Sequence, residues 1–262
     1  MCRLLDPANP SARDQHKDPR GVSDRQPVFN VPTAVVAVIG LLVAIHLARQ
    51  LLAPETEVWL VLAMAFIPAR YAGYAAELPG GEAAAATSLV THMLAHGDAT
   101  HLLFNSAWLL AFGGAVARRV GSTRFLALSL LCGVAGALAF LAAHPGALVP
   151  VIGASGAVSG LMGAAMRFFF SALDTGLWRL RLDPRSVAGT TLGEALRDRR
   201  ILLTTAAWLA INLLAIVGFA GVATDAGIAW EAHLGGYLAG LLTFGLFDSV
   251  PRPRAPEGPG AR

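Results

Sequence analysis

Long apolar runs separated by short polar segments constrain this sequence more than any other feature. The run 125–143 has no charged side chain, and as a helix rising about 1.5 Å per residue it can cross a hydrocarbon core about 30 Å thick. Hydrophobic residues make up 55% of the chain and charged residues only 14%, against about a quarter in soluble domains. Because helices satisfy their own backbone hydrogen bonds in lipid, the sequence predicts an all-α membrane protein.

Six apolar runs predict a bundle of six transmembrane helices. The predicted spans cover about residues 31–52, 101–117, 125–143, 151–166, 201–223 and 227–247. Together they delimit a membrane domain at residues 31–250. Residues 1–30 are polar and rich in Pro, Asp and Arg, which predicts a disordered cytoplasmic tail, and residues 251–262 are predicted to form a second tail.

Two connecting segments stand out. Residues 53–99 contain an apolar stretch too short to span, interrupted by prolines and a Gly-Gly pair, which is typical of an interfacial or partly inserted loop. Residues 171–200 are polar and rich in Arg, and the Thr191-Leu192-Gly193-Glu194 pattern predicts a capping box that starts a short surface helix. We expect this second segment to face the cytoplasm.

The distribution of basic residues predicts the orientation of the bundle. If both termini face the cytoplasm, all of the 20 Lys and Arg residues except Arg49 and Arg70 lie on the inner side, as the positive-inside rule requires. The net charge of +3 then reflects orientation in the membrane, and no nucleic acid partner is expected. In this topology the second, fourth and sixth helices begin on the outer side, which brings His101, Ser155 and His233 to a similar depth.

The fourth run opens with a Gly-x-Ser-Gly motif, Gly153 to Gly156. A serine between small residues at the first turn of a helix has little bulk around its hydroxyl and lies beside unpaired backbone N–H groups, which suits a nucleophile. Ser155 is therefore a candidate. The same small residues, with Gly160 one turn further on, would also suit a close helix–helix contact without any catalytic role.

His233 lies near the start of the sixth run, and ionisable groups inside a span are costly and usually functional. Gly236 and Gly240 share its helix face, as Gly156 and Gly160 share a face of the fourth helix. Packing one glycine row on the other would bring the imidazole beside the serine, where it could act as a base. Alternatively, the histidine only bridges two helices.

The start of the second span carries two further polar residues. Asp98 is a candidate helix cap, and His101 and Asn105, four residues apart, project from one face at the predicted depth of the serine. Both side chains offer N–H donors, which acyl transfer needs to stabilise an oxyanion. The alternative is that these polar residues only hold helices together. That explanation accounts more easily for one such residue than for the set of four that includes Ser155 and His233.

With these motifs in order, the sequence resembles the rhomboid family of intramembrane serine proteases over about residues 30–250. The His-x4-His-x3-Asn pattern of the family corresponds to His96, His101 and Asn105, its Gly-x-Ser-Gly to Gly153–Gly156, and its Ala-His-x-x-Gly-x3-Gly to Ala232–Gly240. The resemblance implies a six-helix rhomboid bundle that hydrolyses peptide bonds in or near the transmembrane segments of single-span substrates, within the lipid bilayer and without a cofactor or metal.

For individual residues, the resemblance implies a Ser155–His233 dyad, with an oxyanion site formed by Asn105, the His101 side chain and the Ser155 backbone N–H. His96 is implied to hold the loop 53–99, and Gly153, Gly156, Gly236 and Gly240 to shape the site. Glu231 is not expected to join the dyad, because a residue two positions before His233 points about 200° around the helix. A multi-pass protein of a bacterial inner (plasma) membrane is expected, whereas the oligomeric state is not indicated.

The sequence departs from the family pattern at two places. Many members have a tyrosine four residues after the nucleophile, which packs against the catalytic ring, and here the position is Ser159. Segment 53–99 lacks a clear Trp-Arg pair, for which Ala69-Arg70 is only a partial substitute.

Other functions are less well supported. A single Asp174-Thr175-Gly176 does not provide the paired carboxylates of an aspartic protease, and the His-Glu-x-x-His motif of metalloproteases is absent. Cys2 and Cys132 are too few for a disulfide framework or a metal cluster. A transporter would be expected to show paired interrupted helices related by an internal repeat, and the sequence shows no such pair. The main alternative is a catalytically inactive rhomboid-like protein that binds membrane clients, although such proteins typically lack the serine or the histidine, and this chain has both.

Overall fold

The structure, a computed structural model, describes residues 31–176, 184–217 and 229–250. The predicted tails, 1–30 and 251–262, lie outside these ranges. So do residues 177–183 of the Arg-rich segment and residues 218–228, where the fifth predicted span ends and the sixth begins.

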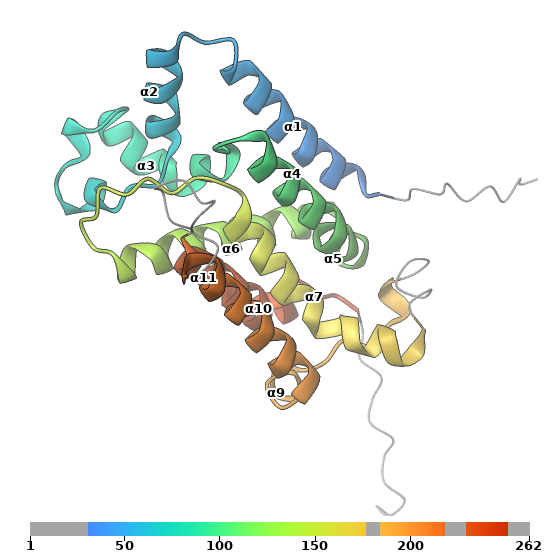
Figure 1. The fold of residues 1–262 in the computed structure, drawn as a ribbon. Coiled ribbons are helices and arrows are strands. Elements are labelled where there is room, and N and C mark those ends of the chain that lie inside the picture. The colour runs from blue at the N-terminus through green and yellow to red at the C-terminus, as the bar shows by residue number, and fades with distance from the viewer. Residues whose placement is uncertain (1–30, 177–183, 218–228, 251–262) are drawn as a thin grey trace, which may run out of the picture. The chain divides into compact units, whose positions relative to one another are not determined.

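The described residues form helices joined by short connections (Figure 1), and within these ranges the only strand-like pairing is an isolated bridge between Phe66 and Val151. The prediction of an all-α protein is therefore confirmed. The α-helices are α1 (Thr33–Arg49), α2 (Pro54–Met64), α3 (Gly81–Thr91), α4 (Ala99–Trp108), α5 (Gly114–Val120), α6 (Ser122–Ala143), α7 (Ser155–Thr175), α9 (Leu192–Ala195), α10 (Arg199–Val217) and α11 (Trp230–Phe247). Shorter turns lie at Pro68–Ala72, Ala75–Glu77, His92–Leu94 and Pro184–Ser186, and a π-helical turn, Leu109–Gly113, joins α4 to α5.

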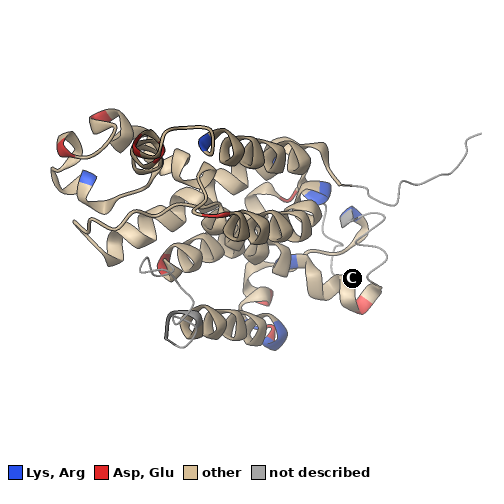
Figure 2. Cartoon of the chain, turned by 45° about the horizontal axis from the view of Figure 1, so that its top comes forward, with Lys and Arg blue, Asp and Glu red and all other residues tan. Residues whose placement is uncertain are grey.

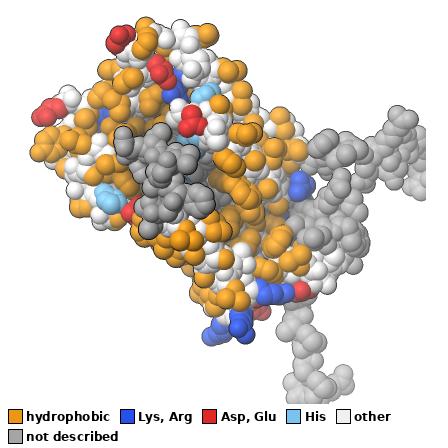
Figure 3. Space-filling view, viewed as in Figure 1, with side chains coloured by type: hydrophobic (Ala, Val, Ile, Leu, Met, Phe, Trp, Pro, Cys, Tyr) orange, Lys and Arg blue, Asp and Glu red, His pale blue; other side chains and the backbone are white. Residues whose placement is uncertain are grey.

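Three described stretches are long and apolar enough to cross a membrane: Ala99–Val120, which combines α4 and α5, and the helices α6 and α7. The helix α1 is apolar but has only 17 residues. Few charged residues interrupt the helices (Figure 2), and hydrophobic side chains cover most of the described surface in Figure 3. Exposing so many apolar side chains is favourable in contact with lipid and unfavourable in contact with water. Six spans stay a prediction.

The helix α7 lies at the centre of the bundle. In its most apolar 18-residue window 72% of the residues are buried, against 39% in the windows of Ala99–Val120 and of α6. It packs against α6 and α11, and Leu161 and Phe168 of α7 share one hydrophobic core with Phe125 of α6 and Phe244 of α11. The nucleophile candidate therefore begins the most buried of these three stretches.

Helix starts follow the predicted chemistry. The Asp98 side chain accepts a hydrogen bond from the His101 N–H at 2.8 Å, which confirms the cap at the start of α4. The capping box before α9 is also confirmed, because Thr191 and Glu194 exchange side chain–backbone hydrogen bonds. Between α5 and α6 the chain turns at Gly121, whose φ of +86° is readily adopted only by glycine.

The helix α7 differs from the predicted span 151–166. It begins at Ser155 and continues to Thr175, beyond Arg167, where the predicted span ended. Arg167 is buried and donates hydrogen bonds to the carbonyls of Leu241 and Thr190, so its guanidinium is satisfied inside the protein and does not need to reach the headgroups.

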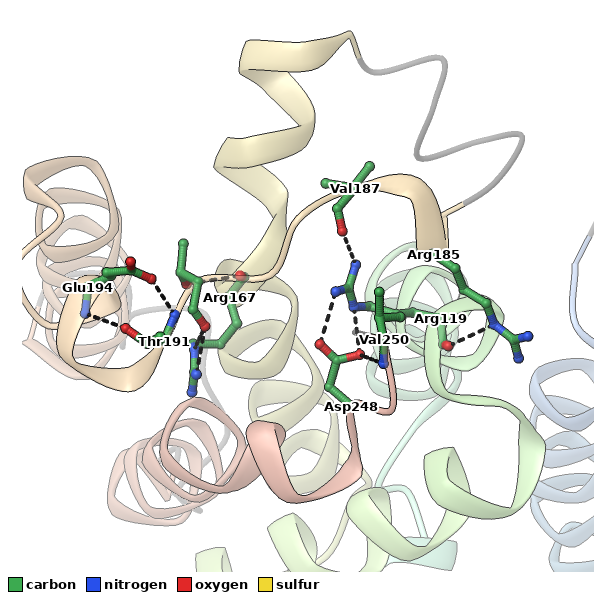
Figure 4. A network of polar contacts seen from close by, with 9 residues as sticks. Arg119, Arg167, Arg185, Val187, Thr191, Glu194, Asp248 and Val250 are labelled. Atoms are coloured by element: carbon green, nitrogen blue, oxygen red, sulfur yellow. Dashed lines mark hydrogen bonds and ion pairs between the residues drawn. The ribbon is translucent and has the colours of Figure 1, made fainter. Parts of the chain in front are cut away.

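A cluster of arginines ties the Arg-rich segment to the helices (Figure 4). Arg119, at the end of α5, is fully buried and forms a two-pronged ion pair with Asp248, at N···O distances of 3.1 and 2.9 Å. It also donates to the Val187 carbonyl and lies over the Phe168 ring. Arg185 in turn donates to the backbone carbonyl of Arg119. We call Arg119, Arg167, Arg185 and Asp248 the arginine cluster.

Asp248 provides a test of the arginine cluster. Asp248→Asn removes the carboxylate charge and leaves the buried Arg119 guanidinium without its counter-ion, which should lower the free energy of unfolding by about 3–5 kcal/mol. Thermal unfolding of the purified protein in detergent would measure the change. As the control, Asp174→Asn breaks an exposed ion pair with Arg200 and should leave the midpoint almost unchanged. Equal midpoints for Asp248→Asn and wild type would contradict the assignment.

Candidate active site

The side chains of Ser155 and His233 meet although 78 residues separate them in the sequence. Ser155 is the first residue of α7, and His233 lies in the first turn of α11. The serine Oγ lies 2.8 Å from the histidine Nε2. An imidazole nitrogen at hydrogen-bond distance from a serine hydroxyl is able to accept its proton, which is the arrangement that nucleophilic catalysis by serine needs.

Two rows of glycine bring α7 and α11 close enough for this contact. A Cβ atom added to Gly236 would collide with the carbonyl oxygen of Gly156, and one added to Gly240 would collide with the carbonyl oxygen of Gly160. The two backbones therefore touch directly, as small residues permit in membrane helices. A larger residue at Gly160, Gly236 or Gly240 would therefore push the helices apart and separate the serine from the histidine.

The second ring nitrogen of His233 meets a side chain that the sequence analysis did not include. Asn212 of α10 has its Oδ1 2.8 Å from the histidine Nδ1, and its Nδ2 donates to the Trp208 carbonyl at 2.9 Å. The signal was present in the sequence, because a strongly polar residue inside the apolar run 201–223 is costly unless it has a partner or a function.

His101 and Asn105 lie on α4, and the His101 ring reaches the Gly-x-Ser-Gly motif. Gly153, with φ of +117°, has no room for a side chain, since a Cβ there would lie 2.7 Å from His101 Nε2 and 3.8 Å from Ser155 Oγ. The His101 ring therefore lies against the motif that contains the serine. Asn105 is buried, and its Nδ2 donates to the His101 carbonyl at 2.9 Å, which occupies one of its two amide hydrogens.

The loop before Ser155, residues 144–154, which we call the nucleophile loop, is held by segment 53–99. Hydrogen bonds from the backbone of this loop connect the two: Val151 exchanges two hydrogen bonds with Phe66, the Gly153 N–H donates to the His92 carbonyl at 2.9 Å, and the Ala154 N–H donates to the side-chain Nε2 of His96 at 3.3 Å. Two buried arginines hold the segment itself: Arg49 donates to the His96 carbonyl and to Glu57, and Arg70 donates to the carbonyls of Leu62 and Pro79. The position of the serine backbone therefore depends on segment 53–99.

His96 can make its contact only as a neutral ring. Its side chain is fully buried, and burial, together with the positive charges of His101, His46 and Arg49, lowers its pKa from 6.5 to about 4. Because Nε2 accepts the hydrogen bond from Ala154, the ring proton must lie on Nδ1. Protonation of Nε2 at low pH would break this link between segment 53–99 and the nucleophile loop.

Glu231 points to a different partner. Its Oε1 lies 2.8 Å from Nε2 of His144, which follows the end of α6. Both ring nitrogens of His233 are already engaged, by Ser155 and by Asn212. The geometry therefore agrees with the expectation that the glutamate stays outside the dyad.

Ser159 takes the position where many members of the family have a tyrosine. Ser159 is buried in α7, and a serine at this position offers no ring to stack on a histidine. The buried tyrosine of the region, Tyr237, stacks instead on Trp208, with ring centroids 4.7 Å apart. Within the described ranges, no group of three or more His, Cys, Asp or Glu side chains is arranged to hold a metal ion.

Comparison with known proteins gives a family match. The sequence model described as "Rhomboid domain" matches residues 83–248, which contain every candidate site residue named above. The chain is 40% identical over 78 residues to rhomboid protease GluP of Bacillus subtilis (strain 168). It is 41% identical over 75 residues to YdcA of the same strain, which is also named for the rhomboid family.

These pairwise matches are partial. They cover 30% and 29% of this chain, and only 15% of GluP and 37% of YdcA, so the chain matches well under two thirds of either relative.

The pKa of His96 predicts a pH dependence of stability. Its folded-state value of about 4 lies below the value of 6.5 in an unfolded chain, so this stabilising effect is complete above pH 6.5 and is lost as the pH falls toward 4. Between pH 7 and pH 5 wild type should lose about 2 kcal/mol relative to His96→Gln, which keeps an acceptor but does not titrate. Thermal unfolding at both pH values measures this, and an identical pH dependence in the two proteins would contradict it.

Proposed function

The chain belongs to the rhomboid family, and we propose that it is an intramembrane serine endopeptidase, which hydrolyses peptide bonds in or near the transmembrane segments of other membrane proteins. The observation that carries the proposal is the 2.8 Å contact between Ser155 Oγ and His233 Nε2. It is supported by the family match over residues 83–248 and by the three helices that can cross a membrane. The protein is thus a multi-pass membrane protein.

In the proposed mechanism Ser155 is the nucleophile and His233 the general base. The hydroxyl proton moves to Nε2 while Oγ forms a bond with the substrate carbonyl carbon. The tetrahedral intermediate then breaks its C–N bond, and the imidazolium gives its proton to the leaving amine. Water, activated by the same histidine, hydrolyses the acyl-serine and restores the enzyme.

The oxyanion is proposed to bind between α4 and the start of α7. Asn105 has a second amide hydrogen besides the one donated to His101, and the His101 ring lies against Gly153. The N-terminus of α7 has no side-chain cap among the described residues, so the Ser155 N–H lacks such a partner there. Donors fixed in advance around one point are what stabilises a developing negative charge.

The remaining predicted residues are proposed to support the site. His96 holds the nucleophile loop through the Ala154 N–H, and Gly153 makes room for the His101 ring. Gly156, Gly236 and Gly240 permit the close approach of α7 and α11. The proposed chemistry uses neither cofactor nor metal.

The substrates are proposed to be single-span membrane proteins. A serine at the end of a spanning helix must receive an extended peptide, so the substrate helix has to unwind near its own end. Helix-breaking or small residues make that unwinding less costly. We therefore expect cleavage after a small residue near the outer boundary of the membrane.

Variants of the site residues test the mechanism on a purified single-span substrate, with the cleavage point mapped by mass spectrometry. Ser155→Ala should abolish cleavage and labelling by a fluorophosphonate probe, and His233→Ala nearly so, because a serine hydroxyl without a base is a poor nucleophile. Asn105→Ala removes one donor of several, so the cleavage rate should fall by about 10²-fold. Glu231→Gln is the control and should cleave normally.

Two outcomes would refute the mechanism: full proteolysis by Ser155→Ala, or a folded Glu231→Gln protein as inactive as His233→Ala. A wild-type protein that binds membrane clients without cleaving or labelling would instead support the catalytically inactive alternative.

The proposed topology has six spans in a bacterial inner membrane, with both termini and residues 171–200 in the cytoplasm. It rests on the distribution of basic residues, of which Arg119, Arg167 and Arg185 gather in the arginine cluster (Figure 4). Arg167 lies 12 residues after Ser155 in α7, which is about 18 Å along the helix. In a chain with Cys2→Ser and Cys132→Ala, a single cysteine introduced at position 185 or 197 should react with a membrane-impermeant maleimide only after the cells are opened. Labelling in intact spheroplasts would overturn the proposed orientation.

A further inference from the structure

We propose that Asn212 is a positioning residue for the general base, a third member of the catalytic unit that holds His233 in the tautomer needed to deprotonate Ser155. This inference rests on the proposed function. It assigns a task in the site to α10.

The two contacts of the histidine determine its protonation pattern. A neutral imidazole carries one hydrogen, and the asparagine Oδ1 that faces Nδ1 is an acceptor, so the hydrogen must lie on Nδ1. Nε2 then presents its lone pair to the serine hydroxyl. In the other tautomer Nε2–H would donate to Ser155 Oγ, and the ring could not act as a base.

The orientation of the asparagine amide is itself determined by a second contact. Its Nδ2 donates to the Trp208 carbonyl, one helical turn earlier in α10. If the amide were turned over, its oxygen would face that carbonyl and its NH₂ would face Nδ1, placing two acceptors together. Asn212 therefore presents its oxygen to His233 and cannot exchange the two roles without losing a hydrogen bond.

The helix that carries Asn212 is aligned with α11 by neighbouring contacts. Thr205, Trp208 and Asn212 follow at spacings of three and four residues, which places them on one face of α10. Trp208 stacks on Tyr237 of α11, and Thr205 Oγ1 lies 2.6 Å from the Tyr237 hydroxyl. His233 and Tyr237 are themselves one turn apart, so the two faces match along their length.

A neutral acceptor suits this position. When Ser155 transfers its proton to Nε2, the ring becomes an imidazolium whose Nδ1–H still donates to the amide oxygen, and the polarised bond becomes stronger. A carboxylate would stabilise the cation more, but it would have to be held ionised beside apolar helices between reaction cycles, at a considerable desolvation cost. Proteases with a Cys-His-Asn arrangement likewise combine a catalytic histidine with an asparagine instead of a carboxylate.

The experiment compares substitutions of Asn212 on the single-span substrate. Asn212→Ala removes the acceptor and should lower kcat by about 10- to 100-fold while KM changes little, because the contact serves the chemical step and not substrate binding. Asn212→Asp keeps an oxygen toward Nδ1 and should recover most of the lost rate, even though its second oxygen faces the Trp208 carbonyl and lowers the stability of the protein. A role limited to packing predicts the opposite order, since burying a carboxylate disturbs α10 more than a truncation does.

Thr205→Val is the matched control. It removes one hydrogen bond between α10 and α11 on the same helix face, but leaves His233 and its two partners untouched. It should lower the thermal midpoint about as much as Asn212→Ala and keep kcat within about threefold of wild type. If Asn212→Ala fails to fold, Asn212→Asp is the deciding variant. A kcat of Asn212→Asp below a tenth of the wild-type value overturns the proposal.

The rate of labelling by a fluorophosphonate separates this inference from the proposed function. Slow labelling of Ser155 in Asn212→Ala, with normal labelling in Thr205→Val, supports a role in activating the nucleophile. Equal labelling and cleavage by Asn212→Ala and wild type overturn the inference and leave the endopeptidase intact. Absence of labelling in wild type refutes the proposed function itself.

Discussion

The direct contact between the backbones of α7 and α11 is the constraint on which the candidate site depends. Glycine rows on both helices remove the side chains that would otherwise keep the axes apart, and α6 adds a third close approach, since a Cβ on Gly136 would meet the Ala232 carbonyl. Catalytic groups on packed helices are held more accurately than groups on loops. A serine and a histidine far apart in the sequence thereby reach hydrogen-bond distance.

Buried arginines connect chain segments at two places in the described part of the protein. Arg49 and Arg70 donate mainly to carbonyls of segment 53–99, near the start of α7, whereas the arginine cluster joins the end of α5 to Asp248 and to the Val187 carbonyl. Burying a guanidinium is tolerable when its donors are used, and each such group then joins several segments at once. Hydrogen bonds from buried arginines therefore hold both segment 53–99 and the Arg-rich segment in place.

Much of the site could be predicted from the sequence because motif spacing and helix geometry act over short distances. The Asp98 cap, the capping box at Thr191 and the matched glycine rows follow from residue identity and local periodicity. Contacts between distant segments do not follow from residue identity or local periodicity. The pairing of Phe66 with Val151, the turn of Glu231 toward His144 and the extension of α7 to Thr175 depend on how whole helices pack, which no local pattern encodes.

Asn212 and Ser159 belong to one physical problem, which is how an imidazole keeps its orientation in a site without a carboxylate partner. An aromatic ring stacked on the histidine limits its tilt but leaves its tautomer open, because a π face contacts both nitrogens alike. A hydrogen bond to Nδ1 limits both, since it requires the ring plane to point at the acceptor and the proton to lie on that nitrogen. Where Ser159 cannot stack, the 2.8 Å contact from α10 therefore supplies the stricter of the two restraints.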